Sequence, residues 1–305
     1  MKHKSVLLNE AIENLNLKED SIIVDATLGY AGHSSEILKR IKRGCLYAFD
    51  QDRQAIEASD KRLSEIGDNY KIIKSNFVNM KEELRKLGVE KVDGVLFDLG
   101  VSSPQLDEGK RGFSFHQDAP LDMRMDQESN FSAYNVVNEY SKEELARIFF
   151  EYGEDKFALR IAENIIKNRP INTTLELVEV IKEVVPEKVK REKHPARKIF
   201  QAIRIEVNHE LEILTSSIKD ALDLLNVGGR VLVITFHSLE DRIVKNLFKE
   251  ITSIDPLVKG LPKIPDEYLP NYKLVNNKAI IPTDVELEYN NRSRSAKLRI
   301  IERIK

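Results

Sequence analysis

The chain of 305 residues carries a formal net charge of −2, with 41% hydrophobic and 32% charged residues and one cysteine, Cys45. These values indicate a globular protein of one large domain or two ordinary ones, and they exclude a wholesale polyanion binder. No apolar run approaches the roughly 20 residues of a membrane helix, and the lone cysteine fits a reducing compartment, so we expect a cytoplasmic protein without membrane contact.

The first hundred residues alternate between strand and helix patterns. Strand-like apolar runs lie near 21–26, 45–49, 70–74 and 93–98, with helical patterns at 33–42, 52–66 and 79–87. This alternation predicts a parallel sheet wrapped by helices.

The pattern then changes to that of a loop, from 105 to about 140, and is helical only from 141 to about 207. The spacings Ser141-x-x-Glu144 and Thr173-x-x-Glu176 are typical of capping boxes at helix starts. Pro195 suits the start of a long helix running through Leu222.

Strand character returns after Gly228-Gly229, which we expect to end that long helix. A buried strand is predicted at 231–236, a helix at 239–251 and, after a proline-rich connector, an edge strand at 297–301. The chain is therefore predicted to be one α/β core split by a helical insertion.

The turn after the first strand suits a nucleoside ligand. That strand ends in Asp25, a small-residue turn runs from Gly29 to Gly32, and the second strand ends in Asp50. Glycine lets the backbone approach a ligand, and an acid closing the second strand accepts hydrogen bonds from ribose hydroxyls. Neither G-x-G-x-x-G nor G-x-x-x-x-G-K-[ST] occurs, so a phosphate chain is poorly served. S-adenosylmethionine, a nucleoside that carries an amino acid, fits this layout.

The fourth strand carries a second chemical signal, because it runs into Asp98 and then Ser102-Ser103-Pro104. Ligands of an open parallel sheet bind beyond the carboxyl ends of its strands, which would bring Asp98 beside Gly29 and Asp50. Ser103-Pro104 partly resembles the motif with which amino-methyltransferases hold an exocyclic amine. Acceptors for the amine hydrogens stabilise the pyramidal transition state more than the planar ground state. The competing interpretation is a turn in which Asp98 only caps backbone amides.

Basic residues gather in two segments. Residues 188–204 hold seven Lys/Arg and one acid, and residues 290–305 hold six Lys/Arg and one acid. Local clusters of this kind suit contact with a phosphate backbone. They equally suit a solvated helix face and a charged edge strand, so both interpretations stay open.

Taken together, the motifs resemble the ribosomal RNA small subunit methyltransferase H family. The matching pieces run in order through nearly the whole chain: SVLLNEA at 5–11, TLGYAGHS at 27–34, DLGVSSPQL at 98–106, RGFSF at 111–115, PLDMRM at 120–125, KHPA at 193–196 with FQA at 200–202, FHSLEDR at 236–242 and RSRSAKLR at 292–299. The resemblance implies methyl transfer from S-adenosylmethionine to N4 of a specific cytidine in small-subunit (16S) ribosomal RNA.

The resemblance also implies an architecture, a Rossmann-like class I methyltransferase sheet with an inserted all-helical domain. Residues 1–105 and 208–305 would form the cofactor-binding core, and residues 106–207 the substrate-recognition domain. Small-subunit ribosomal RNA, within the small ribosomal subunit, would be the partner. The sequence leaves open which cytosine is modified, whether free RNA or the assembled subunit is the substrate, and whether the protein is a homodimer.

Carried over position by position, the family's cofactor site implies Ala31, Gly32, His33, Asp50, Phe77, Asp98 and Gln105. Ala31 and Gly32 would keep side chains out of the cofactor's way, and Phe77 would face the adenine. His33 alternatively only starts a helix. Ala31 stands where the family pattern has glycine, which is harmless at a negative φ and costly at a positive one.

The catalytic candidates are Asp98, Ser103 and His237. Asp98 would face the methionine amine or the cytosine amine, and His237 is either a substrate-side hydrogen bonder or a structural cap. The RNA-binding candidates are Lys190, Arg191, Lys193, His194 and Arg197, which alternatively only coat the insertion. The six histidines and one cysteine show no metal-ligand spacing, so no metal is expected.

A loop carrying Phe113, Phe115, Met123 and Met125 either packs in a core or covers a base, and its glycine, arginine and length favour a lid. Two other function classes compete with the enzyme on RNA. A small-molecule methyltransferase would not need a basic helical insertion. A catalytically silent RNA-binding module would not need Asp98 and the glycine turn, so the presence of both favours a working enzyme.

Overall fold

A computed structural model describes residues 5–192, 194–254, 256, 258 and 262–305. The chain divides into two compact units, one made of Met1–Gly100 and Leu211–Lys305 and the other of Val101–Glu210. The segment predicted as an insertion, 106–207, lies inside the second unit, whose boundaries fall slightly outside the predicted ones.

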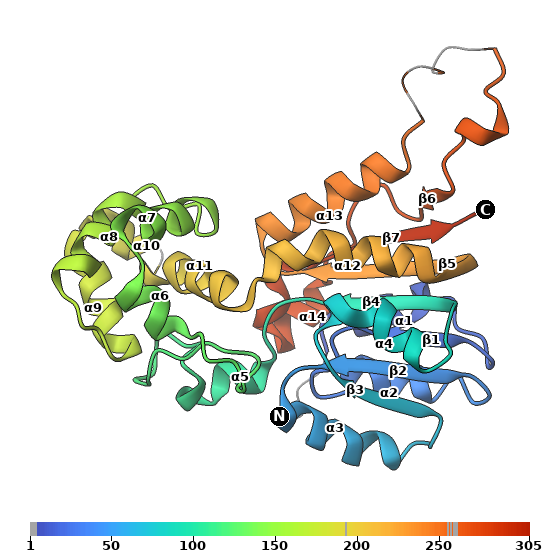
Figure 1. The fold of residues 1–305 in the computed structure, drawn as a ribbon, viewed down its shortest axis with the longest axis horizontal. Helices are drawn as coiled ribbons and strands as arrows, with labels where there is room; N and C mark the ends of the chain where they lie inside the picture. The colour runs from blue at the N-terminus through green and yellow to red at the C-terminus, as the bar shows by residue number, and fades with distance from the viewer. Residues whose placement is uncertain (1–4, 193, 255, 257, 259–261) are drawn as a thin grey trace. The chain divides into compact units, whose positions relative to one another are not determined.

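The first unit is built on a seven-stranded sheet with the order β3-β2-β1-β4-β5-β7-β6 (Figure 1). Its strands are β1 (Ile22–Asp25), β2 (Cys45–Asp50), β3 (Tyr70–Lys74), β4 (Val92–Asp98), β5 (Leu225–Thr235), β6 (Tyr272–Leu274) and β7 (Lys297–Arg303). The strands from β3 to β5 are parallel, and β7 pairs antiparallel with both β5 and β6. The chain reverses its direction of travel across the sheet between β1 and β4, which confirms the predicted Rossmann-like α/β fold.

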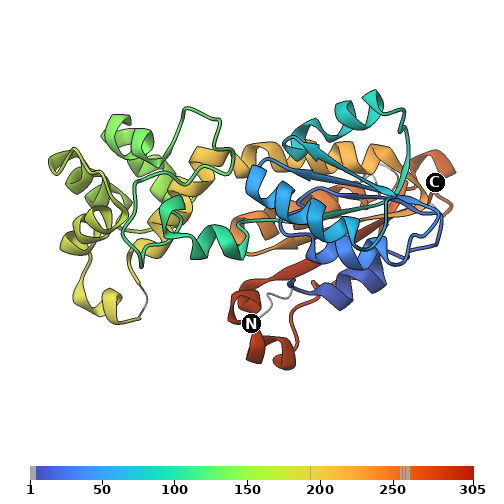
Figure 2. The ribbon, with the colours of Figure 1, turned by 90° about the horizontal axis from the view of Figure 1, so that it is seen from below.

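Helices cover both faces of this sheet (Figures 1 and 2). They are α1 (Leu8–Asn14), α2 (Gly32–Leu38), α3 (Arg53–Ser64), α4 (Met80–Lys86), α12 (Glu210–Leu224) and α13 (Ser238–Ile251). The short helix α14 (Asp284–Tyr289) also belongs to this unit. Val95 and Phe97 of β4 share one apolar cluster with α4, α12 and α13, whereas Leu96 belongs to a cluster with α1, α2 and α3. Alternate strand residues point to opposite faces, so a strand covered on both sides must be apolar throughout.

The second unit is helical around its own apolar core. Its helices are α5 (Ser103–Asp107), α6 (Ala133–Glu139), α7 (Lys142–Glu151), α8 (Ala158–Lys167), α9 (Thr174–Val184), α10 (Glu187–Glu192) and α11 (Ala196–Asn208). Both predicted capping boxes are confirmed, with Ser141 at the start of α7 and Thr173 at the start of α9. Among the described residues, no helix in either unit is both long and apolar enough to cross a membrane.

The structure corrects several predicted elements. The helix expected from Pro195 through Leu222 is two helices, because His209 adopts a φ of 52° in the left-handed region, which histidine visits more readily than most residues. Gly228 and Gly229 lie inside β5, near a register irregularity with β4, rather than at a helix end. β7 is not an edge strand, since the short β6, hidden in the proline-rich connector, pairs with its outer side.

Candidate active site

Three acidic residues end three neighbouring parallel strands of the first unit. Asp25 closes β1, Asp50 closes β2 and Asp98 closes β4, and these strands are adjacent in the order β2-β1-β4. The carboxyl ends of parallel strands meet at one edge of the sheet, where α/β proteins bind their ligands. Asp50 and Asp98 therefore lie at the same edge of the sheet, with β1 between their strands.

The glycine turn after β1 is tied to the end of β2. The Gly29 N–H donates to Asp50 Oδ2 and the Asp52 N–H donates to Asp50 Oδ1, both at 2.8 Å. Burial raises the pKa of Asp50 to about 6 against the lowering effect of these hydrogen bonds. A carboxylate oxygen has more than one acceptor site, so Asp50 retains the capacity to bind ribose hydroxyls.

A second set of contacts fixes the turn from α3. The Ser59 hydroxyl donates to the carbonyl of Gly29 at 2.8 Å, and Arg62 donates to the carbonyl of Tyr30 at 3.0 Å. These bonds occupy the turn's carbonyls. The chain's own side chains thus hold the loop in place.

Ala31 lies in the conformation in which the missing glycine matters. Its φ is 56°, in the left-handed region, and its side chain is fully buried at the start of α2. For an L-residue this conformation costs roughly 1–2 kcal/mol. The departure from the family pattern is therefore a local strain.

Gly32 lies close to another part of the chain. A Cβ at this position would come within 1.8 Å of Ser5 Oγ. The space beside Gly32 is therefore filled by the chain's own N-terminal segment. The predicted place of Gly32 in the cofactor site stays a prediction.

His33 is a buried side chain with two neighbours. Its Nε2 lies 3.1 Å from the carbonyl oxygen of Val6, and its Nδ1 lies 3.5 Å from Asp98 Oδ2. Burial lowers the pKa of His33 to about 4, so the ring is neutral at pH 7. The structure thus brings together His33 and Asp98, two residues that the resemblance assigned to the cofactor.

Asp98 has an unsatisfied oxygen. Its backbone N–H donates to Thr27 Oγ1 at 2.6 Å, but Oδ1 is buried and, among the described residues, meets no hydrogen-bond partner. A quarter of the side chain is nevertheless exposed. The interpretation in which Asp98 only caps backbone amides is therefore not supported.

The environment of Asp98 disfavours its charge. Burial raises its pKa well above the usual value, and the carboxylates of Asp25, Glu240 and Glu286 raise it further. Asp25 itself is occupied, because its carboxylate accepts bonds from the Ser34 hydroxyl at 2.6 Å and the Thr27 N–H at 3.1 Å. A cation or a hydrogen-bond donor at Asp98 would relieve this excess of acid.

Phe77 lies just beyond β3, at the start of a short 3-10 helix, Phe77–Asn79. Its ring meets that of Phe97 edge-on, with centroids 5.6 Å apart and an interplanar angle of 90°. The half-buried ring is therefore held from one side by the core. Its contact with adenine stays a prediction.

Gln105 and Ser103 both belong to the second unit, in the short helix α5. The Ser102 N–H donates to Gln105 Oε1 at 2.9 Å, and Gln105 is 7% exposed. The predicted roles of Gln105 at the cofactor and of Ser103 in catalysis stay predictions.

His237 caps helix α13. Its Nδ1 accepts the N–H of Glu240 at 3.5 Å, while Glu240 Oε2 accepts the N–H groups of Phe236 at 2.8 Å and His237 at 3.3 Å. This reciprocal arrangement is a capping box with histidine as the cap. The geometry favours the structural alternative for His237, and its catalytic role stays a prediction.

The candidate RNA-binding residues differ in exposure and pairing. Lys190 forms an ion pair with Glu187 at 2.6 Å, whereas Arg191 and Arg197 are exposed at the surface of the second unit. Lys193 lies outside the described residues. His194 stacks on Phe115, with centroids 4.6 Å apart and an interplanar angle of 23°. Arg191 and Arg197 thus remain the best placed for phosphate.

The second basic segment is partly neutralised within the first unit. Lys297 Nζ lies 2.9 Å and Arg299 Nε 2.7 Å from the Asp241 carboxylate, joining β7 to α13. These two cations lower the pKa of Asp241 against the effect of its burial. This part of 290–305 is an internal ion-pair network.

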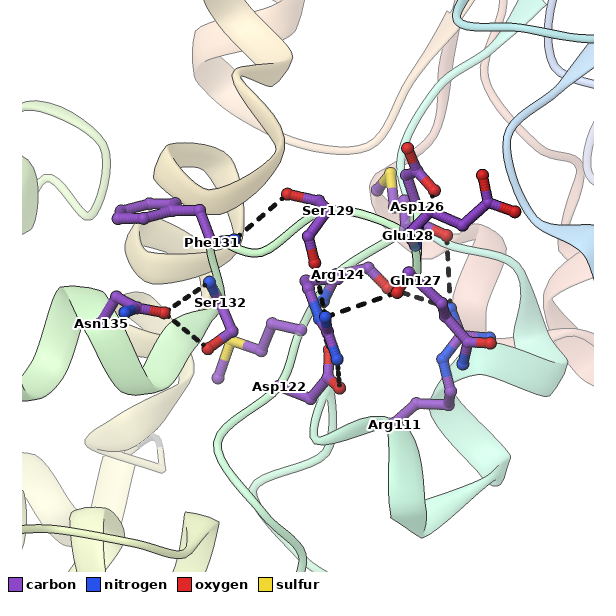
Figure 3. Close-up of polar contacts among 12 residues, drawn as sticks. Arg111, Asp122, Arg124, Asp126, Gln127, Glu128, Ser129, Phe131, Ser132 and Asn135 are labelled. Atoms are coloured by element: carbon purple, nitrogen blue, oxygen red, sulfur yellow. Dashed lines mark hydrogen bonds and ion pairs between the residues drawn. The ribbon is translucent and has the colours of Figure 1, made fainter.

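The loop predicted as a lid is held inside the second unit (Figure 3). Asp122 and Arg124 form a two-pronged ion pair, with Nε–Oδ1 at 2.9 Å and Nη2–Oδ2 at 2.7 Å, and Arg111 donates to the carbonyl of Arg124 at 2.9 Å. Phe113 is 6% exposed and Met123 is fully buried in the helical core. The lid prediction was wrong, and the core-packing alternative holds.

Sequence reasoning missed the contacts that position Asp98. Neither the Thr27 hydroxyl nor the Val6 carbonyl was assigned a role, and the pairing of His33 with Asp98 was not foreseen. The contacts of Thr27 and His33 with Asp98 join residues far apart in the chain, so no local periodicity could have indicated them. The strand-ending acids and the family resemblance pointed to Asp98, but neither indicated these contacts.

Comparisons with known proteins identify the family of this chain. A family model described as the MraW methylase family matches residues 1–304. A relative from Exiguobacterium sibiricum, named ribosomal RNA small subunit methyltransferase H, is 56% identical over 308 residues, covering 100% of this chain and 99% of its own. A relative of the same name from Clostridioides difficile is 54% identical over 307 residues, covering 99% of each chain.

Among solved structures, an rRNA methylase from Streptococcus thermophilus aligns with 100% of this chain and 99% of its own, at 14% identity and a TM-score of 0.44. The Rossmann-like fold is assigned from the order of the strands in the sheet and not from this alignment. The match of the family model and the two relatives shows that this chain belongs to the MraW methylase family, and it is an S-adenosylmethionine-dependent methyltransferase.

Proposed function

We propose that this protein methylates the exocyclic N4 of a specific cytidine in small-subunit (16S) ribosomal RNA. The observation that carries the proposal is Asp98, whose buried Oδ1 lacks a partner among the described residues at the ligand-binding edge of the sheet. The names of the two relatives support the ribosomal substrate. Such a substrate implies a cytoplasmic enzyme.

The first unit offers groups that fit the cofactor. Asp50, already fixed by two backbone N–H donors, would accept the ribose hydroxyls, and the half-buried ring of Phe77 would face the adenine. Asp98 supplies an unpartnered acceptor in acidic surroundings, which suits a cationic group. S-adenosylmethionine, when bound, supplies an electrophilic methyl group on a positively charged sulfur.

Asp98 is proposed to act on the amine of the base. The N4 lone pair of cytosine is delocalised into the ring, so the nitrogen must become pyramidal before it attacks. An ionised Asp98 accepts a hydrogen bond from the amine and stabilises the charge that grows on nitrogen. Because the amine is not acidic enough to ionise at neutral pH, its proton would leave only after the carbon–nitrogen bond forms and the methyl–sulfur bond breaks, and the Asp98 carboxylate would take it. Ser103 is the second proposed acceptor.

The helical second unit is proposed to bind the RNA. It carries the exposed Arg191 and Arg197, and α10 adds Lys190, whose pairing with Glu187 a phosphate would replace. A base inside a helix must leave its stack to be methylated. Backbone contacts from this unit would hold the strand from which the cytosine is turned out.

The test is nucleoside mass spectrometry after incubation of the protein and S-adenosylmethionine with two substrates, free small-subunit RNA and assembled small subunits. The proposal predicts N4-methylcytidine in at least one of them, at a single position. The matched control is Asp98→Asn, which keeps the side chain's shape. Methylation at a ring carbon, on another base or on neither substrate would contradict the proposal.

A further inference from the structure

The protonation of His33 is fixed by its contact with Val6. A carbonyl oxygen can only accept a hydrogen bond, so the 3.1 Å contact requires a proton on Nε2. His33 is 4% exposed, and burial holds its pKa at about 4, so the ring carries no second proton at pH 7. The lone pair of Nδ1 therefore points at its other neighbour, Asp98.

Two acceptors consequently face one another. His33 Nδ1 lies 3.5 Å from Asp98 Oδ2, and an ionised Asp98 would set a carboxylate against a lone pair. One proton between them removes the conflict, and the pair then has no net charge. The distance is at the outer limit of a hydrogen bond, so this proton would be weakly held.

Three nearby carboxylates also oppose the ionisation of Asp98. They come from three elements: Asp25 at the end of β1, Glu240 in α13 and Glu286 in α14. Glu286 is held in place because its Oε1 accepts the N–H of Leu7 at 3.0 Å. The three carboxylates add to the effect of burial, which is the largest cause of the raised pKa of Asp98.

We propose that His33 is a positioning residue for Asp98, and that the pair holds one proton in the cofactor-free enzyme and releases it to solvent when S-adenosylmethionine binds. Asp98 passes from carboxylic acid to carboxylate, and buffer takes the proton. The positive charge of the cofactor favours the ionised form. Asp98 thus gains the charge needed to accept the amine hydrogen only once the methyl donor is bound.

The proposal rests on the cofactor site and on the role given to Asp98, but not on the identity of the methylated base. Titration calorimetry of S-adenosylmethionine, without RNA, measures it at pH 7 in buffers of different ionisation enthalpy. The dependence of the apparent enthalpy on the buffer gives the number of protons released. Asp25 and Asp50, with pKa values of about 6, are each about a tenth protonated at pH 7 and contribute little.

Three variants test which residues hold the released proton. Asp98→Asn should abolish most of the release that the wild type shows. His33→Gln places an amide near the Nε2 position, keeps the bond to Val6 and removes the Nδ1 acceptor, so release at pH 7 should fall and its pH midpoint should move down. Asp50→Asn, the control, should bind more weakly yet release the same number of protons. Circular dichroism checks that each variant is folded.

The outcomes are separable. Buffer-independent binding enthalpy in the wild type, or the same release and midpoint in His33→Gln, would overturn the proposal. If Asp98→Asn does not fold, the His33→Gln comparison still decides. Failure to find N4-methylcytidine would refute the proposed function while leaving proton release as measured, because the calorimetry contains no RNA.

Discussion

Replacing Asp50 by alanine tests the cofactor site with a magnitude that the structure allows to be worked out. The substitution removes a charge-assisted acceptor for the ribose, which is worth about 1.5–3 kcal/mol, or roughly a 10- to 150-fold increase in Kd. It also removes the two carboxylate oxygens that accept hydrogen bonds from the N–H groups of Gly29 and Asp52, each at 2.8 Å. Leaving such groups without partners costs about 1–3 kcal/mol each where they are buried, so stability falls too.

Asp93→Ala separates the two effects. Asp93 also accepts two bonds, from the Ile22 N–H at 2.8 Å and from Asn226 at 2.9 Å, but it lies near the start of β4, at the opposite edge of the sheet. Both variants should unfold at lower urea concentration, and only Asp50→Ala should lose affinity in titration calorimetry. Equal Kd values for S-adenosylmethionine in wild type and Asp50→Ala would remove Asp50 from the ribose site.

Three further predictions concern strain, pH and RNA. Ala31→Gly should leave the free energy of unfolding within about 1 kcal/mol of the wild-type value, because relief of the strained φ of 56° offsets the loss of a buried methyl group and the extra chain entropy of glycine; a urea melt showing a loss of about 2 kcal/mol or more would refute the strain. Burial raises the pKa of Asp25 to about 6. The contribution of the protonated side chain to the free energy of unfolding is therefore fully present below about pH 4 and is lost as the pH rises through 6. The free energy of unfolding of Asp25→Asn should therefore fall below that of wild type by about 2 kcal/mol more at pH 4.5 than at pH 7. Urea melts of both proteins at the two pH values measure this difference, and an equal loss at both would contradict the prediction. Neutralising the basic residues of 190–193 should weaken RNA binding and flatten its salt dependence by about one unit of slope per lost phosphate contact, with cofactor affinity unchanged; an unaltered slope would make the segment a solvated face.

The sequence was sufficient for the part of the fold that depends on local pattern. Alternating apolar runs located β1 to β4 within a residue or two, and the acids that close them identified one edge of the sheet as the site. Capping chemistry located the starts of α7 and α9, because a capping box is satisfied within four residues. These features need no knowledge of distant contacts.

What could not be predicted depends on contacts between distant segments. No pattern tells that Ser5 fills the space beside Gly32, or that His33 meets Asp98. The loop's length suggested a lid, but Met123 is buried in a core supplied by helices that follow it. The position of β7 inside the sheet was hidden for the same reason, since only its pairing with β6 covers its outer edge.

The most direct test of the central claim is the single-turnover rate of methyl transfer to cytidine N4 by Asp98→Asn. The enzyme is in excess over the small-subunit substrate, and both the enzyme and S-adenosylmethionine are at saturating concentrations. Asparagine keeps the size of the side chain and its contact with His33 but has no charge to place against the amine. Saturation removes any loss of cofactor or RNA affinity from the comparison. The account predicts a rate lowered by about 10²-fold or more, the usual cost of losing one electrostatic contact to the transition state. A rate within a few-fold of wild type would contradict it and move the amine acceptor away from Asp98.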